Sequence, residues 1–379
     1  MLRIAIKMLQ GDRAKYYGLI FGIAFATLLM SQQVSIFVSL LGRTASQIND
    51  ITEASVWVMD PQTQYIEETK AMPARDLQRV RGVTGVEWAV PLFKGMAVVR
   101  AGEGILNQVI VMGVDDASLI GRPPRMILGS WEDIRQPNAM IMDRAGFEFI
   151  WPGEKMELGR EIEINDRRIR IVGICDSTPP FVTFPVTFMR YSEATKIVPT
   201  ERNAMSFILV KPREGISPKE AATRIHEETG LQALTKPEFM QRSITYVLTR
   251  TGIPINFGIT IVLGFVIGAA VAGQTFFIFV IENLKQFGAL KAIGVTNAQI
   301  LTMVLAQAAI VAFIGYAIGI GLTTSFFEAT KDVTALRGFF MPWQVAAGTA
   351  VAIVFIILIA SLASIRKVMV LDPAIVFRG

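Results

Sequence analysis

Four long runs of the chain contain no Asp, Glu, Lys or Arg. They cover residues 16–42, 251–281, 292–327 and 338–365. Each run exceeds the roughly 20 residues that a helix needs to cross about 30 Å of hydrocarbon. Core helices of soluble proteins rarely continue this far without a charge. The pattern therefore predicts an α-helical membrane protein with four transmembrane helices, at residues 16–42, 251–281, 297–327 and 338–365.

The first run follows four basic residues, as a secretory signal peptide would. Signal peptides, however, have an apolar region of about 7–15 residues that ends in a cleavage site of small residues. Residues 16–42 are longer and continue into "SLLGRTASQIND". We therefore expect residues 1–42 to be a short N-terminal stretch followed by a retained membrane anchor.

The segment between the first two runs, residues 43–250, has the pattern of a mixed α/β domain. Alternating and β-branched residues predict strands in "ASVWVMDP", "VEWAVPLFKGMAVVRAG" and "NQVIVMGVDD". A hairpin with "ND" as its turn is predicted in "REIEINDRRIRIVGICD". "PARDLQRVRGV" predicts a short helix with Leu77 and Val80 on its buried face and Gly82 at its end.

Near the end of this domain, "SFILVKPREGISPKEAATRIHEETGLQALT" predicts a strand, a helix and a second strand. Ser217 is the expected N-cap, with Glu220 as its capping-box partner. Strand and helix pairs at both ends of the domain suggest one split α/β module, interrupted by a mostly β insertion at about residues 117–198. The flanking stretches "RTASQINDITE" and "KPEFMQRSITYVLTRTG" predict helical stalks, and Pro254 is expected to end or kink the second one.

The distribution of charge predicts the orientation in the membrane. Of the whole chain, 52% is hydrophobic and only 18% is charged, against about 25% charged in soluble proteins. The domain 43–250 holds 26 of the 37 basic and 27 of the 32 acidic residues and is nearly neutral. Because short basic segments stay in the cytoplasm, we expect both termini, the connection 282–296 and the tail 366–379 there. The domain 43–250 and the loop 328–337 are then outside, and the basic balance reflects membrane topology rather than nucleic-acid binding.

The chain offers little catalytic chemistry. Cys175 is the single cysteine and His226 the single histidine, which lies in a polar helical stretch typical of a surface position. No GxxxxGK[ST] phosphate-binding loop and no GxSxG nucleophile motif occurs. We expect no metal site, no cofactor bound by this chain and no enzyme activity of its own.

Small residues recur at helical spacing in every predicted span and should allow the spans to pack closely against each other or against a second copy. They are Gly18, Gly22 and Ala26, then Gly264, Gly268 and Ala272, then Gly315 and Gly319, and finally Gly348 and Ala352. The absence of charge within the spans argues against an ion-coupled transporter, which normally buries a charged residue in its bundle. Uncharged polar residues remain and could either join helices or line a path. They are Ser31, Gln32, Gln33, Ser35, Gln274 and Gln307.

The loop "DSTPPFVTFPVTF" combines three prolines with Phe181, Phe184 and Phe188. A packed hairpin explains it, and so does an apolar surface that contacts a partner, a substrate or lipid. The sequence leaves both interpretations open.

The connection "ENLKQFGALKAIGVTNAQI", residues 282–300, predicts a short helix, a turn and a new membrane helix. Leu284, Phe287 and Leu290 form an apolar stripe, while Lys291 intrudes on it. Gly294 is the expected C-cap, and Thr296 with Gln299 is a capping box. The helix either lies at the membrane surface as a simple connection or protrudes as a contact for a cytoplasmic partner.

At this point the chain resembles a known family. The chain has one span, an external domain of about 200 residues and three further spans. The stretch "GALKAIGVTNAQI" follows the second span, and "VMVLDPAIVFRG" stands at the end. This order and these stretches resemble the permease subunits of MacB/FtsX-type ABC transporters, also called type VII or mechanotransmission transporters. The stretches "GIAFATLLMSQQ" and "LTRTGIPINFG" are similar to the DevC-like branch. The resemblance covers essentially the full length.

The resemblance implies a function. Two copies, or one copy and a paralogue, pair in the bacterial inner membrane, and each docks on a separate ABC ATPase that binds ATP and Mg²⁺. It places the coupling contact at residues 282–293, with a set of expected contact residues. These are Glu282, Leu284, Lys285, Gln286, Phe287, Gly288, Leu290, Lys291 and Gly294. Family members often have an acidic residue where this chain has Gln286, so a salt bridge at that position is not expected.

In the DevC and MacB branches the external domain works with a periplasmic adaptor (a membrane fusion protein) and an outer-membrane channel, so ATP-driven export is the leading hypothesis. An FtsX-like regulator that moves an external domain to switch cell-wall hydrolases, without transport, is the alternative. Lol-like lipoprotein release, with Phe181 and Phe184 gripping a carrier, is a further one. The identity of the substrate is not encoded in any motif.

Overall fold

The computed structural model describes residue 8 and residues 13–101, 104–123, 125–198, 205–331, 333 and 336–369, the last eight of these by their backbone only. The chain forms two compact units. The helical unit comprises residues up to Ser39, Gly252–Asp332 and residues from Phe339 onward. The α/β domain comprises Leu40–Thr251 and Val333–Gly338.

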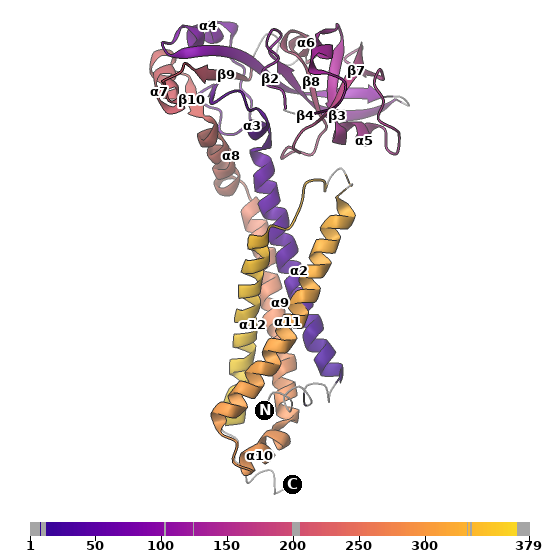
Figure 1. The fold of residues 1–379 in the computed structure, drawn as a ribbon, viewed down its shortest axis with the longest axis vertical. Coiled ribbons are helices and arrows are strands. Elements are labelled where there is room, and N and C mark those ends of the chain that lie inside the picture. The colour runs from indigo at the N-terminus through magenta and orange to yellow at the C-terminus, as the bar shows by residue number, and fades with distance from the viewer. Residues whose placement is uncertain are drawn as a thin grey trace. The chain divides into compact units, whose positions relative to one another are not determined.

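The helical unit contains long apolar helices joined by one short helix (Figure 1). They are α2 (Arg13–Thr44), α9 (Ile253–Glu282), α10 (Leu284–Ala292), α11 (Asn297–Thr330) and α12 (Trp343–Met369). Within the described residues, four of these helices are long and apolar enough to cross a membrane, namely α2, α9, α11 and α12. The four predicted transmembrane helices are therefore confirmed as helices.

Small residues bring these helices into close contact. A Cβ atom added at Gly268 of α9 would lie 2.4 Å from Cβ of Ala26 in α2. One added at Gly319 of α11 would lie 2.5 Å from Cβ of Thr27, again in α2. These contacts confirm the predicted close packing at Gly268 and Gly319. Gly348 of α12 has no described neighbour within 4 Å of such an atom, so packing of Gly348 against a second copy stays a prediction.

Polar side chains also join the helices. Ser31 of α2 and Thr323 of α11 share a hydrogen bond of 2.7 Å between their hydroxyl groups, and both residues are fully buried. Gln307 of α11 is fully buried as well. Of the two roles that the sequence left open for these residues, joining helices is the one observed for Ser31.

The α/β domain is built on a mixed sheet of ten strands (Figure 1). The strands are β1 (Val56–Met59), β2 (Val86–Ala101), β3 (Ile105–Val114), β4 (Arg125–Leu128), β5 (Ala139–Asp143), β6 (Glu161–Ile164), β7 (Arg167–Asp176), β8 (Val186–Arg190), β9 (Phe207–Pro212) and β10 (Gln232–Thr235). The path through the sheet is β10-β1-β9-β2-β3-β8-β5-β7-β4, and β6 pairs with β2 and β7. The helices are α3 (Ser46–Asp50), α4 (Ala74–Gly82), α5 (Arg144–Ile150), α6 (Tyr191–Ile197), α7 (Pro218–Thr229) and α8 (Lys236–Arg250), with a 3-10 helix, η1, at Trp131–Arg135.

The long strand β2 belongs to two lobes. Its first half pairs with β9 up to Leu92, and its second half pairs with β3 from Phe93 onward. The first lobe holds β1, β9, β10, α4 and α7 around a core that includes Val58, Val80 and Ile225. This confirms the predicted split module. The predicted insertion begins too late, because the second half of β2 and all of β3 already belong to the second lobe.

Local predictions in the domain are largely confirmed. Asn165 and Asp166 have φ angles of 49° and 62°, as the two-residue turn between β6 and β7 requires. Ser217 accepts a hydrogen bond from the Glu220 N–H at 3.2 Å and caps α7. The second hydrogen bond of the predicted capping box, from the Ser217 N–H to the Glu220 carboxylate, is wrong, since that carboxylate accepts from Arg224 instead.

The predicted stalk helices are interrupted. A non-helical residue, Ala45, separates α2 from α3. The helix α8 ends at Arg250 and α9 begins at Ile253, with Pro254 in the first turn of α9. Pro254 therefore starts the membrane helix rather than kinking a continuous stalk, which agrees with the preference of proline for the first helical turn.

Candidate functional site

The candidate coupling segment is the helix α10 with the turns on either side of it. Asn283 separates α9 from α10, and its side-chain amide donates a hydrogen bond to the Phe279 carbonyl at 2.8 Å. At the other end, Gly294 has a φ of +93°, and the Val295 N–H donates to the Leu290 carbonyl at 3.0 Å. The predicted end of the helix at Gly294 is confirmed. The positive φ is what requires glycine there, since nothing lies within 4 Å of an added Cβ and crowding is therefore not the reason.

The next helix begins with the predicted capping box. The Thr296 hydroxyl accepts from the Gln299 N–H at 3.4 Å, and the Gln299 side-chain oxygen accepts from the Thr296 N–H at 3.0 Å. Both turns around α10 are therefore fixed by specific hydrogen bonds. As a result, α10 is held as a discrete short helix between two long ones.

One face of α10 packs into the helical unit. Phe287 is fully buried, Gly288 is buried, and Leu284 and Leu290 pack partly against the same apolar cluster, which includes Phe279 and Val304. The predicted apolar stripe is confirmed. Phe287 and Gly288, which were also expected to contact a partner, are buried within the helical unit, and their contact with an ATPase stays a prediction.

The opposite face of α10 is open. Lys285, Gln286 and Ala289 are exposed, and Ile293, just after the helix, is 78% exposed. The sequence did not single out Ile293, although an isoleucine directly before the helix-ending glycine was a usable signal. Glu282 forms an ion pair with Lys15 of α2, so this expected contact residue has a partner inside the helical unit. Whether any of these residues contacts an ATPase stays a prediction.

The phenylalanines of the loop 177–185 and strand β8 do not form one exposed surface. Phe188 is 4% exposed and packs edge-to-face on Trp131, with ring centroids 5.7 Å apart. Of the two interpretations that the sequence left open, packing is the one observed for Phe188, which lies on a strand whose first four residues are all buried. The loop is not a hairpin, since β5 lies between β7 and β8 in the sheet. Phe181 and Phe184 are half-buried, and Phe184 packs against the core, so both remain reachable from outside.

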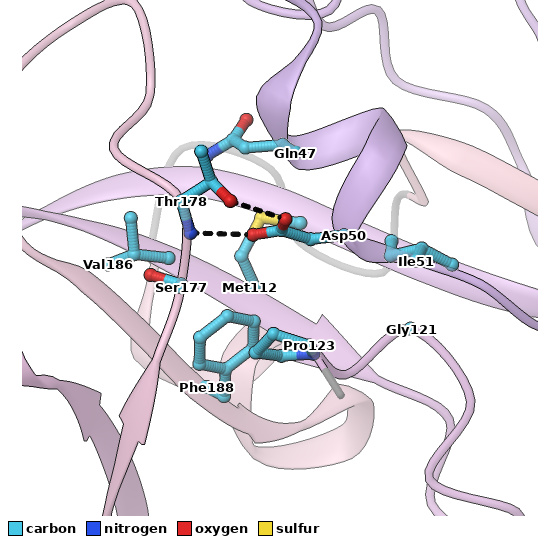
Figure 2. A pocket seen from close by; sticks show the side chains of 10 residues that line it. All are labelled: Gln47, Asp50, Ile51, Met112, Gly121, Pro123, Ser177, Thr178, Val186 and Phe188. Carbon is cyan, nitrogen blue, oxygen red and sulfur yellow. Dashed lines mark hydrogen bonds between the residues drawn. The ribbon is translucent and has the colours of Figure 1, made fainter. Parts of the chain in front are cut away.

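Polar contacts tie α3 and the residue after it to two other parts of the α/β domain, the loop at Thr178 and the helix α8. The Thr178 N–H and hydroxyl donate to the two carboxylate oxygens of Asp50 at 2.8 and 2.7 Å (Figure 2). Lys236 of α8 donates to the Asn49 and Ile51 carbonyls at 3.0 and 2.8 Å. Burial raises the pKa of Asp50, and the Thr178 hydrogen bonds oppose this rise. The α3 segment, which follows the break at Ala45, is thus fixed to the domain.

The cavity beside Asp50 is too small for a substrate. Its volume is about 10 Å³, and Gln47, Met112, Ser177 and Phe188 contribute to its walls (Figure 2). A single water needs at least about 10–15 Å³ measured in this way. This cavity can hold one water at most.

Buried charges in the domain were missed at the level of sequence. Lys94 interrupts the apolar run "PLFKGMAVV" and is 4% exposed, with its ammonium 2.5 Å from Glu67. Burial lowers the pKa of Lys94, and the Glu67 carboxylate acts against this. A single charge inside a predicted central strand was the available signal.

Asp143 is a second missed group. One carboxylate oxygen accepts hydrogen bonds from the N–H groups of Gly146 and Val186, both at 3.0 Å, so Asp143 caps α5 and holds the start of β8. Burial raises the pKa of Asp143 to about 7, against the effect of these hydrogen bonds and of the Arg337 charge. Burial also raises the pKa of the neighbouring Cys175, which is a buried thiol. Among the described residues, no group of three or more His, Cys, Asp or Glu side chains could hold a metal ion.

Comparison with known proteins assigns the chain. Residues 17–228 match the MacB-like periplasmic core domain family, and residues 258–373 match the FtsX-like permease C-terminal family. The first match alone covers more than half of the chain. The chain belongs to the MacB/FtsX family of ABC transporter permeases.

Relatives of this permease bear out the assignment. It is 24% identical over 309 residues to an uncharacterized ABC transporter permease of Mycobacterium tuberculosis (strain ATCC 25618 / H37Rv), an alignment that covers 81% of this chain and 79% of the relative. It is also 24% identical over 223 residues to an uncharacterized ABC transporter permease of Mycobacterium bovis (strain ATCC BAA-935 / AF2122/97), over 59% of this chain and 58% of the relative. With its four apolar helices, this permease is a multi-pass membrane protein.

Two solved structures also align with part of the permease. One is the extracellular domain of the noncanonic ABC-type transporter YknZ from Gram-positive bacteria, at 14% identity and a TM-score of 0.35, over 48% of this chain and 98% of that one. The other is the periplasmic region of MacB from Actinobacillus actinomycetemcomitans, at 13% identity and a TM-score of 0.38, over 51% of this chain and 94% of that one. At these TM-scores the two structures carry no argument, and the assignment depends on the family matches together with the relatives.

Proposed function

We propose that this permease is the membrane subunit of an ATP-driven exporter and that α10 receives the movement of a separate ABC ATPase. The observation that carries the proposal is the division of α10 into two faces. The Phe287 face is buried in the helical unit, and the face with Lys285, Gln286 and Ala289 is exposed. A helix anchored on one side and open on the other can transmit a push without bending.

The ends of α10 support the same role. Asn283, Gly294 and the Thr296–Gln299 capping box fix both turns, so displacement of α10 has to move the helices that follow and precede it. The exposed Ile293 adds an apolar group at the tip, of the kind that gains free energy when a partner covers it.

In the proposed arrangement the partner ATPase binds ATP and Mg²⁺, and this chain binds neither. A second copy or a paralogue completes the membrane part. The protein lies in a bacterial inner membrane, and the charge distribution supports an orientation with both termini in the cytoplasm. The α/β domain, on the other side, engages a periplasmic adaptor and an outer-membrane channel, and its movement drives efflux.

The test is co-purification of the permease with its ATPase from the native membrane. The double variant Gln286→Ala with Ile293→Ser should retain about tenfold less ATPase, which corresponds to about 1.4 kcal/mol of binding free energy. Ile259→Ser is the matched control, because Ile259 is an exposed isoleucine of α9 that lies outside the segment. If the double variant keeps both its ATPase and its ATP-dependent export, α10 is not the coupling contact.

A further inference from the structure

A pocket of about 390 Å³ lies where β2 changes partners between the two lobes of the α/β domain. At this fork the Ser206 hydroxyl accepts from the Lys94 N–H at 2.9 Å and donates to the Lys94 carbonyl at 3.1 Å. These bonds satisfy the backbone where the two strand pairings separate. The volume falls within the range of about 300–1,000 Å³ that is typical of small-molecule sites.

One end of the pocket is polar, and the hydrogen-bond donors of its lysine, Lys94, are all used within the protein. The Lys94 ammonium donates to Gln47 Oε1 at 2.6 Å, to the Ile66 carbonyl at 3.2 Å and to Glu67 Oε2 at 2.5 Å. An ammonium group has three N–H donors, so all of them are used. An anionic ligand would find no free donor on Lys94.

Two other polar groups line the same end. In the described part of the chain, Glu67 Oε1 and the Thr69 hydroxyl form no hydrogen bond with protein groups, and both residues line the pocket. The carboxylate oxygen can only accept, and the hydroxyl can donate or accept. A ligand group that donates a hydrogen bond fits this pair.

The rest of the wall is apolar. Met96 and Ile110 come from β2 and β3, and Val182 and Phe184 come from the loop before β8. Met96 is 52% exposed although it lies on a central strand. Covering such groups with an alkyl chain removes apolar surface from water and favours binding.

The charges of Lys94 and Glu67 decide which kind of ligand head group fits the pocket. A cationic head would approach Glu67 against the Lys94 ammonium, which already neutralises that carboxylate at 2.5 Å. An anionic head would have to break the contacts of Lys94. A neutral head with hydroxyl or amide donors meets neither obstacle.

We propose that this pocket binds a neutral amphiphile, whose head group donates a hydrogen bond to Glu67 Oε1 beside Thr69 and whose alkyl chain lies on Met96, Ile110, Val182 and Phe184. The site is independent of the proposed coupling to an ATPase, because all of its residues belong to the α/β domain. Its ligand need not be the exported cargo.

The experiment uses the full-length chain in lipid nanodiscs and a decanol analogue that carries an alkyl diazirine. After irradiation, peptide mass spectrometry should place the label at residues 94–96 and 182–184. Unlabelled decanol should compete at an at least about tenfold lower free concentration than decanoate or decylamine, with partition into empty nanodiscs subtracted. A tenfold preference is the size expected from one hydrogen bond to a charged group. Equal or stronger competition by decanoate or decylamine overturns the proposal.

Variants of the pocket provide the second arm. Thr69→Val and Phe184→Ser should each reduce labelling at these residues by about tenfold or more. Thr223→Val on α7 and Phe149→Ser on α5 make the same chemical changes at exposed positions outside the pocket and should leave labelling unchanged. If Phe184→Ser unfolds the domain, Met96→Ser replaces it, since Met96 is half exposed. Labelling that is spread over the membrane helices and unaffected by the pocket variants shows partition into lipid only and refutes the site.

Discussion

The close contact between α11 and α2 leads to a quantitative prediction for Gly319→Ala. The added Cβ would lie 2.5 Å from Cβ of Thr27 and 2.6 Å from the Ala24 carbonyl oxygen. Because one of these atoms belongs to the backbone, a rotamer change cannot relieve the clash. Overpacking of this kind costs about 1–3 kcal/mol.

Gly321 provides the matched control. It lies on the same helix, is exposed, and has nothing within 4 Å of an added Cβ. Both substitutions gain the same helix-propensity term of about 0.5–1 kcal/mol. The difference in the free energy of unfolding between Gly319→Ala and Gly321→Ala therefore isolates the clash, and we expect Gly319→Ala to be less stable by about 1–3 kcal/mol.

The assay is thermal unfolding of the purified permease in one detergent, followed by the circular dichroism of its helices. Gly319→Ala should unfold several degrees below Gly321→Ala, since about 1 kcal/mol shifts the midpoint by a few degrees in a chain of this size. Equal midpoints for the two variants would mean that α2 and α11 do not approach at Gly319, and the helix packing described above would be wrong.

Three further predictions concern the cap of α11 and the buried charges. Thr296→Ala should lower the free energy of unfolding by about 1 kcal/mol, because it removes the capping box. Thr302→Ala, at an exposed position one to two turns later, should lower it by less. Equal losses for the two variants in a denaturation series would argue against the cap. Asp143 has a folded pKa of about 7, above its unfolded value, so its contribution to stability is present at low pH and is lost as the pH rises towards and through 7. Asp143→Asn should flatten this decline, which for one proton has a maximal slope of about 1.4 kcal/mol per pH unit; identical pH profiles of the two proteins would contradict the raised pKa. Lys94→Met should destabilise the domain by about 3–5 kcal/mol, because it leaves the buried Glu67 unpaired, and the double variant Lys94→Met with Glu67→Met should recover much of this loss. The control is Lys211→Met, at the exposed pair with Glu87, which should cost under about 1 kcal/mol. An equal loss of stability in both lysine variants would show that burial of the ion pair is unimportant.

The features that the sequence predicted well are those set by local chemistry. Charge-free length identified the four long helices, and capping residues located the start of α11 and the stop at Gly294. The turn at Asn165 and Asp166 was equally local. In each case the deciding contacts lie within a few residues of one another, so a sequence pattern contains all of the information.

The features that it missed depend on contacts between distant segments. Lys94 meets Glu67 from 27 positions away and Gln47 from 47, and no local pattern announces such a cluster. The boundary of the second lobe was misplaced because one strand, β2, serves both lobes, and its change of partner near Leu92 depends on where β9 and β3 return. For Phe188 the sequence left packing and a contact surface both open, because the strands β3 and β5 that bury β8 come from distant parts of the chain.

The helix α10, the candidate coupling segment, shows the same limit of sequence analysis within one element. Its apolar stripe was predicted correctly, but such a stripe can pack either against the protein's own core or against a partner. The structure places Phe287 in the core and leaves the residues between the stripe positions exposed, and the proposed ATPase contact uses those exposed residues. A Phe287→Ala variant would therefore act through a cavity in the helical unit and cost about 3–5 kcal/mol of stability. Loss of transport in that variant would not identify a contact, whereas loss of ATPase binding in the exposed-face variant, with an unchanged unfolding midpoint, would.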